Sequence, residues 1–329
     1  MSANRQIRWG ILSTANIGRK RVVPAMQAAR NGRVVAVASR DVARAKSFAD
    51  ELSIPTAYGS YEELIADPNI DAIYNPLPNH MHTEWSIKSA EAGKPVLCEK
   101  PLASDAAEAQ HMVDTFARLG IPLAEAFMYR FHPQTQRVKK MVDEGAVGDV
   151  RLISASFEFN VRDEDDIRLK AEMAGGSMMD VGCYCVSIAR MITGEEPHRV
   201  TATANYEPNG GVDNIAGGTL HFPSGVIAVF DSGVRSYFTH RYEVRGTSGR
   251  IVVDEAFVIN PTLPSKIRYW HDDAPGGYEE IEIPAANSYT LMAEDFADAL
   301  LNNRPPLFPA QDAADAMVVL DNLRAAARR

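Results

Sequence analysis

The chain has 329 residues, which at about 150 residues per domain corresponds to roughly two domains. Apolar residues make up 46% and charged residues 23%, a balance that excludes a disordered or fibrous protein. The 34 basic and 43 acidic side chains give a net charge of −9 without any basic run, which argues against nucleic acid and anionic lipid as partners.

Cysteine and histidine spacing gives no sign of a disulfide framework or a metal site. The three cysteines, Cys98, Cys183 and Cys185, cannot all pair and lack zinc spacing, and the histidines show no metal-ligand spacing. The segment MSANRQIRWG has no apolar signal core, and no run of about 18 apolar residues occurs. We therefore expect a cytoplasmic protein with reduced thiols, no metal and no membrane attachment.

Short apolar runs alternate with helical patterns through the first third of the chain. This alternation is typical of a parallel sheet with helices on both faces, a doubly wound α/β domain. The predicted strands are 7–12, 34–39, 54–59, 72–77, 95–100 and 121–127, and the predicted helices between them include 17–29, 43–52, 61–65 and one that ends at Ala92.

After a helix predicted at 133–143, strands follow one another with few helices between them. Turn pairs such as Asn209-Gly210 and Ser248-Gly249 separate some of them, so a mainly antiparallel sheet is expected. We predict a dinucleotide-binding domain over 1–124 and an α+β domain with an open sheet over 125–329. The strands expected there are 151–159, 199–207, 217–222, 226–232, 241–246, 250–257, 266–271 and 278–284, with helices at 176–191, 288–301 and 310–327.

The turn after the first predicted strand reads GILSTANIG. A dinucleotide-binding turn has the pattern G-x-G-x-x-G, and these positions hold Ser13, Ala15 and Gly18. Small residues still allow a pyrophosphate to approach, and the following helix N-terminus supplies amide donors. An ordinary strand–helix turn would also explain the motif, but its position in a strand–helix–strand unit favours a cofactor site. The predicted site residues are Ser13, Thr14, Ala15, Asn16 and Ile17.

The second predicted strand ends in Ser39-Arg40, and Arg44 follows one helical turn later. Sites selective for NAD usually place a carboxylate here to bind the ribose 2′-hydroxyl. A serine hydroxyl and guanidinium groups suit a 2′-phosphate instead. NADP is therefore expected over NAD, although solvated residues at a helix start would give the same pattern.

Several segments are similar to those of the GFO/IDH/MocA family, the glucose–fructose oxidoreductase and inositol dehydrogenase relatives. They are AIYNPLPNHMH, GKPVLCEKP, EAFMYRFHP and GGSMMDVGCYCV. Within the family, AYGSYEEL, VLCEKP and the tyrosine in VGCYCV resemble NADP-dependent D-xylose dehydrogenases and dimeric trans-dihydrodiol dehydrogenases. The resemblance implies a Rossmann domain and an α/β domain whose sheet forms a homodimer or homotetramer interface. It implies cofactor-side roles for Pro78, Asn79, His82, Glu99 and Lys100, and substrate-lining roles for Phe127, Tyr129 and Arg130.

Lys100, Asp180 and Tyr184 form the predicted catalytic set. Lys100 follows a parallel strand at the sheet edge where ligands bind, and Asp180 and Tyr184 are spaced i, i+4 on a predicted helix that follows Gly175-Gly176. Tyrosine normally titrates near pH 10, and a neighbouring ammonium favours its phenolate. We predict Tyr184 as the acid/base for a substrate hydroxyl, Lys100 as its activating cation and Asp180 as a substrate-positioning group. The family often has histidine where this chain has Tyr184.

Two features allow either a structural or a functional explanation. His82 fits a cofactor-side loop and equally fits a hydrogen-bonded histidine at a helix start. Arg162 and Arg168 flank an acidic run at 163–166, which is typical of a solvated loop, although such loops can close over a sugar.

These residues predict an NADP-dependent dehydrogenase that transfers hydride between nicotinamide and a CH–OH group of a sugar, such as D-xylose, or of a cyclic trans-diol. The expected partner is that small carbohydrate or diol. Three alternatives stay open: a reductase of keto- or anhydro-sugars, an NAD-dependent glycosidase of the same family, and a non-catalytic dinucleotide-sensing regulator. Ser39-Arg40 argues against the glycosidase, and the presence of Lys100, Asp180 and Tyr184 argues against the regulator.

Overall fold

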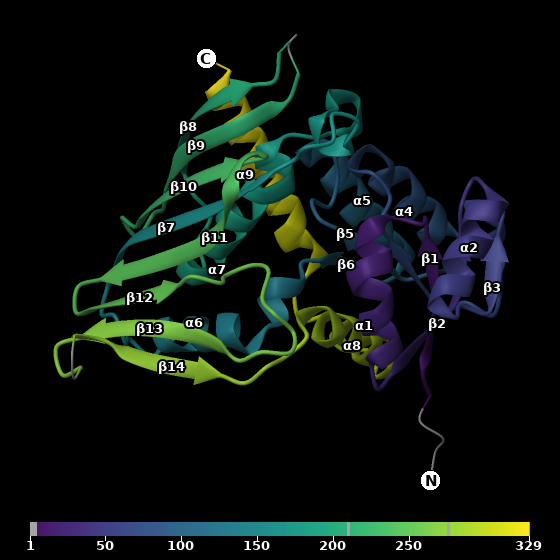
Figure 1. The fold of residues 1–329 in the computed structure, drawn as a ribbon, viewed down its shortest axis with the longest axis horizontal. Helices are drawn as coiled ribbons and strands as arrows, with labels where there is room; N and C mark the ends of the chain where they lie inside the picture. Colours follow the sequence, from purple (N-terminus) through teal and green to yellow (C-terminus); the bar gives the residue numbers. More distant parts are fainter. Residues whose placement is uncertain (1–4, 209–210, 275–276, 329) are drawn as a thin grey trace. The chain divides into compact units, whose positions relative to one another are not determined.

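The computed structural model describes residues 5–208, 211–274 and 277–328, which fold as two compact units (Figure 1). The first unit comprises Met1–Met128 with Ser288–Ala314, and the second comprises Tyr129–Asn287 with Asp315–Arg329. The predicted boundary after residue 124 did not include the return of 288–314 to the first unit. Nothing local in that segment indicates which of the two units it joins.

The first unit contains a six-stranded sheet in the order β3-β2-β1-β4-β5-β6, and all of its neighbouring strands run parallel. The chain begins in the middle of the sheet and builds outward in both directions, so the strand order reverses between β1 and β4. Ligands of such sheets bind at the carboxyl ends of the strands near this reversal. The predicted doubly wound sheet is confirmed. Its strands are β1 (Ile7–Leu12), β2 (Gly32–Ala38), β3 (Thr56–Tyr58), β4 (Ala72–Asn75), β5 (Val96–Glu99) and β6 (Leu123–Ala126).

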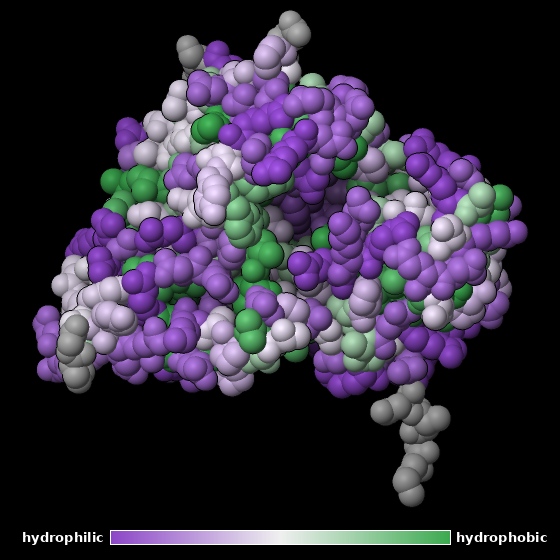
Figure 2. Space-filling view, viewed as in Figure 1, coloured by the Kyte–Doolittle hydropathy of each residue, from purple (hydrophilic) through white to green (hydrophobic). Residues whose placement is uncertain are grey.

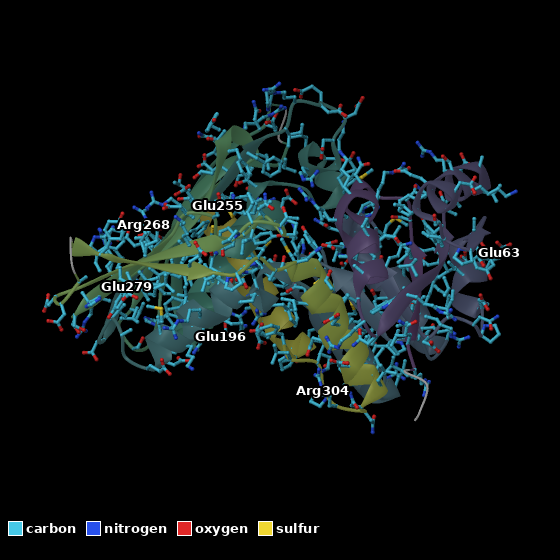
Figure 3. The ribbon with its side chains drawn as sticks, turned by 60° about the horizontal axis from the view of Figure 1, so that its bottom comes forward. Glu63, Glu196, Glu255, Arg268, Glu279 and Arg304 are labelled. Atoms are coloured by element: carbon cyan, nitrogen blue, oxygen red, sulfur yellow. The ribbon has the colours of Figure 1, made fainter. Side chains whose placement is uncertain are left out.

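Helices α2 and α3 of this unit begin at capping residues that the sequence supplies. Asp41 accepts hydrogen bonds at the start of α2, and Ser60 accepts one from the Glu63 amide at the start of α3. Glu63, labelled in Figure 3, reaches back and accepts a hydrogen bond from the Gly59 amide at 3.1 Å, just before the N-cap. The helices are η1 (Gly18–Val22), α1 (Val23–Ala28), α2 (Val42–Leu52), α3 (Tyr61–Ala66), η2 (Asn79–Met81), α4 (His82–Glu91) and α5 (Ala106–Leu119).

Helix α8 (Ser288–Leu301) belongs to the first unit because its side chains pack against β1 and against the turn that leads into β2. The Phe296 ring lies 5.8 Å from the Trp9 ring, and the side-chain amide of Asn31 donates to the carbonyl of Glu294 at 2.8 Å. Arg304, labelled in Figure 3, lies just beyond α8 and donates to Asp295 at 2.7 Å.

The second unit contains an eight-stranded sheet in the order β14-β13-β12-β11-β7-β10-β9-β8. Most neighbours are antiparallel, as predicted, but β10 pairs with β7 in parallel because α7, β8 and β9 intervene between them in the chain. The predicted turn at Asn209-Gly210 lies outside the described residues. The strands are β7 (Val150–Asn160), β8 (Arg199–Tyr206), β9 (Asp213–His221), β10 (Ile227–Gly233), β11 (Arg235–Gly246), β12 (Gly249–Val253), β13 (Ser265–His271) and β14 (Glu279–Ile283).

One face of this sheet is covered by helices. Ile153, Ala155 and Phe157 alternate along β7 toward that face and are buried, and Phe157 contacts Tyr184 of α7. Figure 1 shows α6 and α7 on the same side of the strands. The remaining helices are η3 (Met128–Phe131), α6 (Pro133–Asp143), η4 (Ile167–Leu169), η5 (Ala171–Met173), η6 (Met178–Gly182), α7 (Cys183–Thr193) and α9 (Ala310–Ala327).

The surface of both units is mainly hydrophilic on the face drawn in Figure 2, where hydrophobic residues form separate small patches. Among the described helices, none combines the length and the apolar character needed to cross a bilayer.

Candidate active site

The turn after β1 holds serine at the first glycine position of the dinucleotide-binding pattern. Ser13 has φ of 100°, in the region that favours glycine. Its amide donates to the Ala38 carbonyl at 3.0 Å, and its hydroxyl accepts from the Ala15 amide at 3.2 Å and donates to the Pro76 carbonyl at 3.3 Å. Residues 13–17 therefore form a fixed loop that leads into a helix N-terminus, which fits the pyrophosphate of a dinucleotide.

The end of β2 presents cations at the position where a 2′-phosphate would lie. Arg40 and Arg44 are exposed there, and buried Ser39 accepts a hydrogen bond from the Asp41 amide at 3.3 Å. The nearby carboxylate of Asp41 accepts from the amides of Ala43 and Arg44 and so serves as the cap of α2. The predicted residues thus suit a phosphorylated ribose better than a free 2′-hydroxyl.

Tyr61 supports this position from α3. Burial raises the pKa of Tyr61, and the nearby positive charge of Arg40 acts in the opposite direction. The phenol therefore lies near the guanidinium that the sequence assigns to the cofactor. Nothing in the sequence indicated this proximity, because the two residues belong to different elements.

Strand β5 ends at Glu99, Lys100 follows it, and the Lys100-Pro101 peptide is cis. Glu99 accepts a hydrogen bond from the Tyr74 hydroxyl at 2.5 Å. Tyr74 has no exposed surface, and burial together with Glu99 raises its pKa well above the usual value. Glu99 is thus held by β4, which fixes the start of the segment that presents Lys100.

His82 lies beneath the same loops. The ring is fully buried, with Nδ1 2.9 Å from the carbonyl oxygen of Pro101 and Nε2 2.7 Å from that of Leu77. Burial lowers the pKa of His82 to about 4. The ring links the loops that follow β4 and β5 and has no exposed surface, which fits the structural explanation that the sequence left open for this histidine.

Topology brings the predicted cofactor residues to one edge. The loops at 13–17, 39–44, 78–79 and 99–100 all follow the carboxyl ends of parallel strands of one sheet. Pro78 and Asn79 are half-buried at the start of η2. The sequence-based grouping of these positions therefore corresponds to one surface of the first unit.

Tyr184 lies in the first turn of α7 and is surrounded by aromatic rings of the second unit. Its ring centroid is 5.1 Å from Phe157, 5.3 Å from Phe257 and 5.6 Å from Tyr129. The side chain is 6% exposed, so its orientation is fixed by packing while a small part of it reaches the surface. Sequence patterns could not indicate Phe157 and Phe257, which the sheet brings to α7 from distant strands and loops.

Tyr129 has no exposed surface, and its hydroxyl donates to Ser187 at 2.8 Å. Its ring packs against Tyr184, and its substrate-lining role stays a prediction. Phe127 and Arg130 are also buried, at 4% and 9% exposure. Phe127 falls in the first unit and Arg130 in the second.

Asp180 lies in a π-helical turn, η6, and not in the regular helix that the i, i+4 argument assumed. Its carboxylate accepts a hydrogen bond from Nε of Arg168 at 2.8 Å. Asp180 and Tyr184 therefore contact different sets of neighbours, although they follow each other at the start of one helical segment.

Gly175-Gly176 allows two other parts of the unit to approach this helix start. A Cβ at Gly175 would lie 2.5 Å from the Arg168 carbonyl oxygen, and one at Gly176, where φ is +109°, would lie 2.4 Å from Oδ1 of Asp213. Asp213 accepts from the Ser177 hydroxyl and from the Met178 amide, each at 2.7 Å. Burial raises the pKa of Asp213. A buried acid from β9 thus caps the helical segment that carries Asp180 and Tyr184.

The doubly wound parallel sheet of the first unit is typical of dinucleotide-dependent oxidoreductases. Residues 7–127 match the family model "Oxidoreductase family, NAD-binding Rossmann fold", and residues 135–252 match "GFO/IDH/MocA C-terminal domain". The chain belongs to the GFO/IDH/MocA family of oxidoreductases, as its motifs predicted. Within the described ranges, no group of three or more His, Cys, Asp or Glu side chains could hold a metal ion.

Similar proteins include sugar and diol dehydrogenases and a ketoreductase. The chain is 42% identical to D-xylose 1-dehydrogenase (NADP(+)) 2 of Haloferax volcanii, over 95% of both chains. It is 36% identical to trans-1,2-dihydrobenzene-1,2-diol dehydrogenase of Xenopus tropicalis over 75% of this chain and 74% of that one. The crystal structure of KijD10, a 3-ketoreductase from Actinomadura kijaniata in complex with NADP and TDP-benzene, superimposes with a TM-score of 0.92 at 31% identity over 98% of both chains.

Proposed function

We propose that the protein is an NADP-dependent dehydrogenase that oxidises a CH–OH group of a sugar, an aldose such as D-xylose, or of a cyclic trans-diol. The observation that carries this proposal is Arg40 and Arg44 at the β2 edge of the dinucleotide sheet, with the carboxylate of Asp41 used as a helix cap. The 42% identity to a relative named as an NADP-dependent D-xylose dehydrogenase supports the same conclusion.

The residues of the first unit would hold the cofactor in three places. Amides of residues 13–17 suit the pyrophosphate, Ser39, Arg40 and Arg44 suit the 2′-phosphate, and the loops at 78–79 and 99–100 suit the nicotinamide side. Bound NADP supplies the hydride-transfer chemistry that amino-acid side chains lack.

Three side chains would handle the substrate. Tyr184 takes the proton from the reacting hydroxyl in oxidation and returns it in the reverse reaction. Lys100 is the cation that favours the phenolate and orients that hydroxyl. Asp180 accepts a hydrogen bond from another substrate hydroxyl. The aromatic packing around Tyr184 supports this role, because it restricts the phenol to one orientation.

Nicotinamide absorbance with purified protein tests the proposal. NADP and NAD are compared against aldoses, inositols, anhydro-sugars and trans-diols. Turnover of an aldose or trans-diol, with a kcat/KM for NADP at least about tenfold above that for NAD, is the expected result. No turnover with any alcohol, together with NAD retained through purification, would overturn the proposal in favour of the glycosidase or the regulator.

A second candidate is the reductase direction on a keto-sugar, which the same residues would serve. The structural similarity to a 3-ketoreductase favours including it. The test measures NADPH consumption with keto-sugars. A kcat/KM for a keto-sugar above that for every alcohol would establish reduction as the main activity.

We also propose that the chain forms a homodimer or homotetramer through the sheet face opposite α6 and α7. Ile215 and Ile227 lie on that face and are 36% and 37% exposed, and charged side chains such as Glu158 and Arg241 lie on the same face. Sedimentation velocity should give a mass of two or four chains, and Ile227→Asp should shift it toward one. A monomer at micromolar concentration would contradict the assembly.

A further inference from the structure

Arg168 lies on the segment that connects β7 to η6, and its side chain contacts Asp180. Nε of Arg168 donates to Oδ2 of Asp180 at 2.8 Å, and Nη1 lies 3.2 Å from both carboxylate oxygens of Asp166. The guanidinium carbon lies 5.6 Å from the centre of the Phe159 ring. One guanidinium is therefore held by two carboxylates and an aromatic face, which fixes its plane.

The main chain of Arg168 is fixed to the same helix start. Its carbonyl accepts a hydrogen bond from the Gly176 amide at 2.8 Å. The close approach of this carbonyl to Gly175 leaves no room for a Cβ there. The side chain of Arg168 thus binds Asp180, and its main chain binds Gly176 just before η6.

The side chains of Arg168, Asp166 and Asp180 form a charged cluster that can bind hydroxyl groups of a ligand. The carboxylates of Asp180 and Asp166 raise the pKa of Arg168, so the guanidinium stays charged at every working pH. The carboxylate oxygens of Asp180 and Asp166 are hydrogen-bond acceptors that carry negative charge. The Asp180 side chain is 16% exposed and that of Arg168 is 40% exposed, so the pair is near the surface. Acceptor oxygens with negative charge bind the O–H donors of a sugar or diol and repel a phosphate.

We propose that Arg168 is a positioning residue that holds the Asp180 carboxylate in the orientation in which it binds a substrate hydroxyl. This inference rests on the role proposed above for Asp180 and adds a residue to it. Without the Arg168 side chain, the carboxylate loses its Nε–H donor, and the segment before η6 loses a bond to the helix start. The loss should appear in the KM for sugar, because the contacts of Arg168 described here all lie in the second unit.

A double-mutant cycle tests the inference. Arg168→Met, Asp180→Asn and the double variant are compared for kcat, for KM of the sugar and for the Kd of NADPH measured by nicotinamide fluorescence. Lys170→Met is the matched control, because Lys170 lies on the same segment and is 3.4 Å from a highly exposed carboxylate, that of Asp165. Arg168→Lys keeps the charge but not the forked geometry.

The expected result is a KM for sugar about tenfold higher in Arg168→Met, with NADPH binding unchanged and Lys170→Met like wild type. Arg168→Lys should recover part of the loss. The KM of the double variant should resemble that of Asp180→Asn, because both substitutions remove the same Arg168–Asp180 interaction. A thermal unfolding midpoint of Arg168→Met near that of wild type separates this effect from general destabilisation. If Arg168→Met does not fold, the same constants are measured in Arg168→Lys.

Two results would overturn the inference, and only the second would also overturn the role proposed for Asp180. If Asp180→Asn raises KM while Arg168→Met does not, or if the two effects add, Arg168 does not position Asp180 although Asp180 binds substrate. If Asp180→Asn has no effect on KM or kcat, the role proposed for Asp180 fails, and the role of Arg168 fails with it.

Discussion

Single residues in the candidate site could be predicted by type, but their supporting partners could not. Lys100, Asp180 and Tyr184 stand in motifs that are visible in the chain. The rings that fix Tyr184 and the guanidinium that contacts Asp180 come from other elements, so only folding brings them together. His82 shows the reverse case, because a residue in a recognisable motif has both ring nitrogens at carbonyl groups inside the unit.

Arg40 gives a prediction about cofactor choice. Arg40→Ala should raise the Kd of NADP by about 10- to 100-fold, because a charge-assisted bond to phosphate is worth roughly 1.5–3 kcal/mol. NAD binding should change little. Fluorescence titration with both nucleotides measures this, and Arg33→Ala, an exposed arginine on β2, is the control. Equal weakening of NADP and NAD would place Arg40 away from the 2′-phosphate.

His240 gives a prediction about pH. Its Nδ1 accepts the Phe257 amide at 3.2 Å, and burial lowers the pKa of His240 to about 4 from an ordinary value of 6.5. Between these values the unfolded chain binds the proton and the folded chain does not, so stability is lost as pH falls from about 7 toward 4, by up to about 3 kcal/mol. Thermal unfolding in His240→Gln should show a weaker decline than in His198→Gln, which changes an exposed histidine. Identical declines in both variants would exclude this contribution.

At the scale of elements, periodicity and turn residues predicted most strands and helices close to where they lie. The parallel pair β7–β10 and the π-helical turn η6 could not be predicted. Strand direction in a sheet depends on which distant strands become neighbours. The π-helical turn depends on the backbone hydrogen bonds of the folded segment, which residue spacing does not reveal.

The glycines at the two ends of the η6–α7 segment give an element-scale prediction. Both Gly176 and Gly194 have positive φ, but a Cβ at Gly176 would meet Asp213, while one at Gly194 meets nothing within 4 Å. Gly194→Ala should cost about 1 kcal/mol of stability, and Gly176→Ala should cost roughly 2–4 kcal/mol because Asp213 must move. Urea unfolding of both variants measures the difference, and equal costs would show that Asp213 does not constrain the helix start.

At the scale of the whole molecule, composition and alternation predicted an α/β domain followed by an α+β domain, and the family match confirms this fold class. The return of α8 to the first unit could not be predicted, since it depends on the packing of Phe296 against Trp9 and on Glu294 next to Asn31.

The central claim is that Tyr184 moves the proton when a sugar or diol CH–OH group is oxidised by NADP. The most direct test is the rate of NADPH formation with saturating NADP and aldose in wild type and in Tyr184→Phe, with Tyr206→Phe, a partly exposed tyrosine, as control. Loss of about 10²- to 10⁴-fold in kcat, with unchanged NADP affinity, is the predicted result. A kcat close to that of wild type in Tyr184→Phe would contradict the claim.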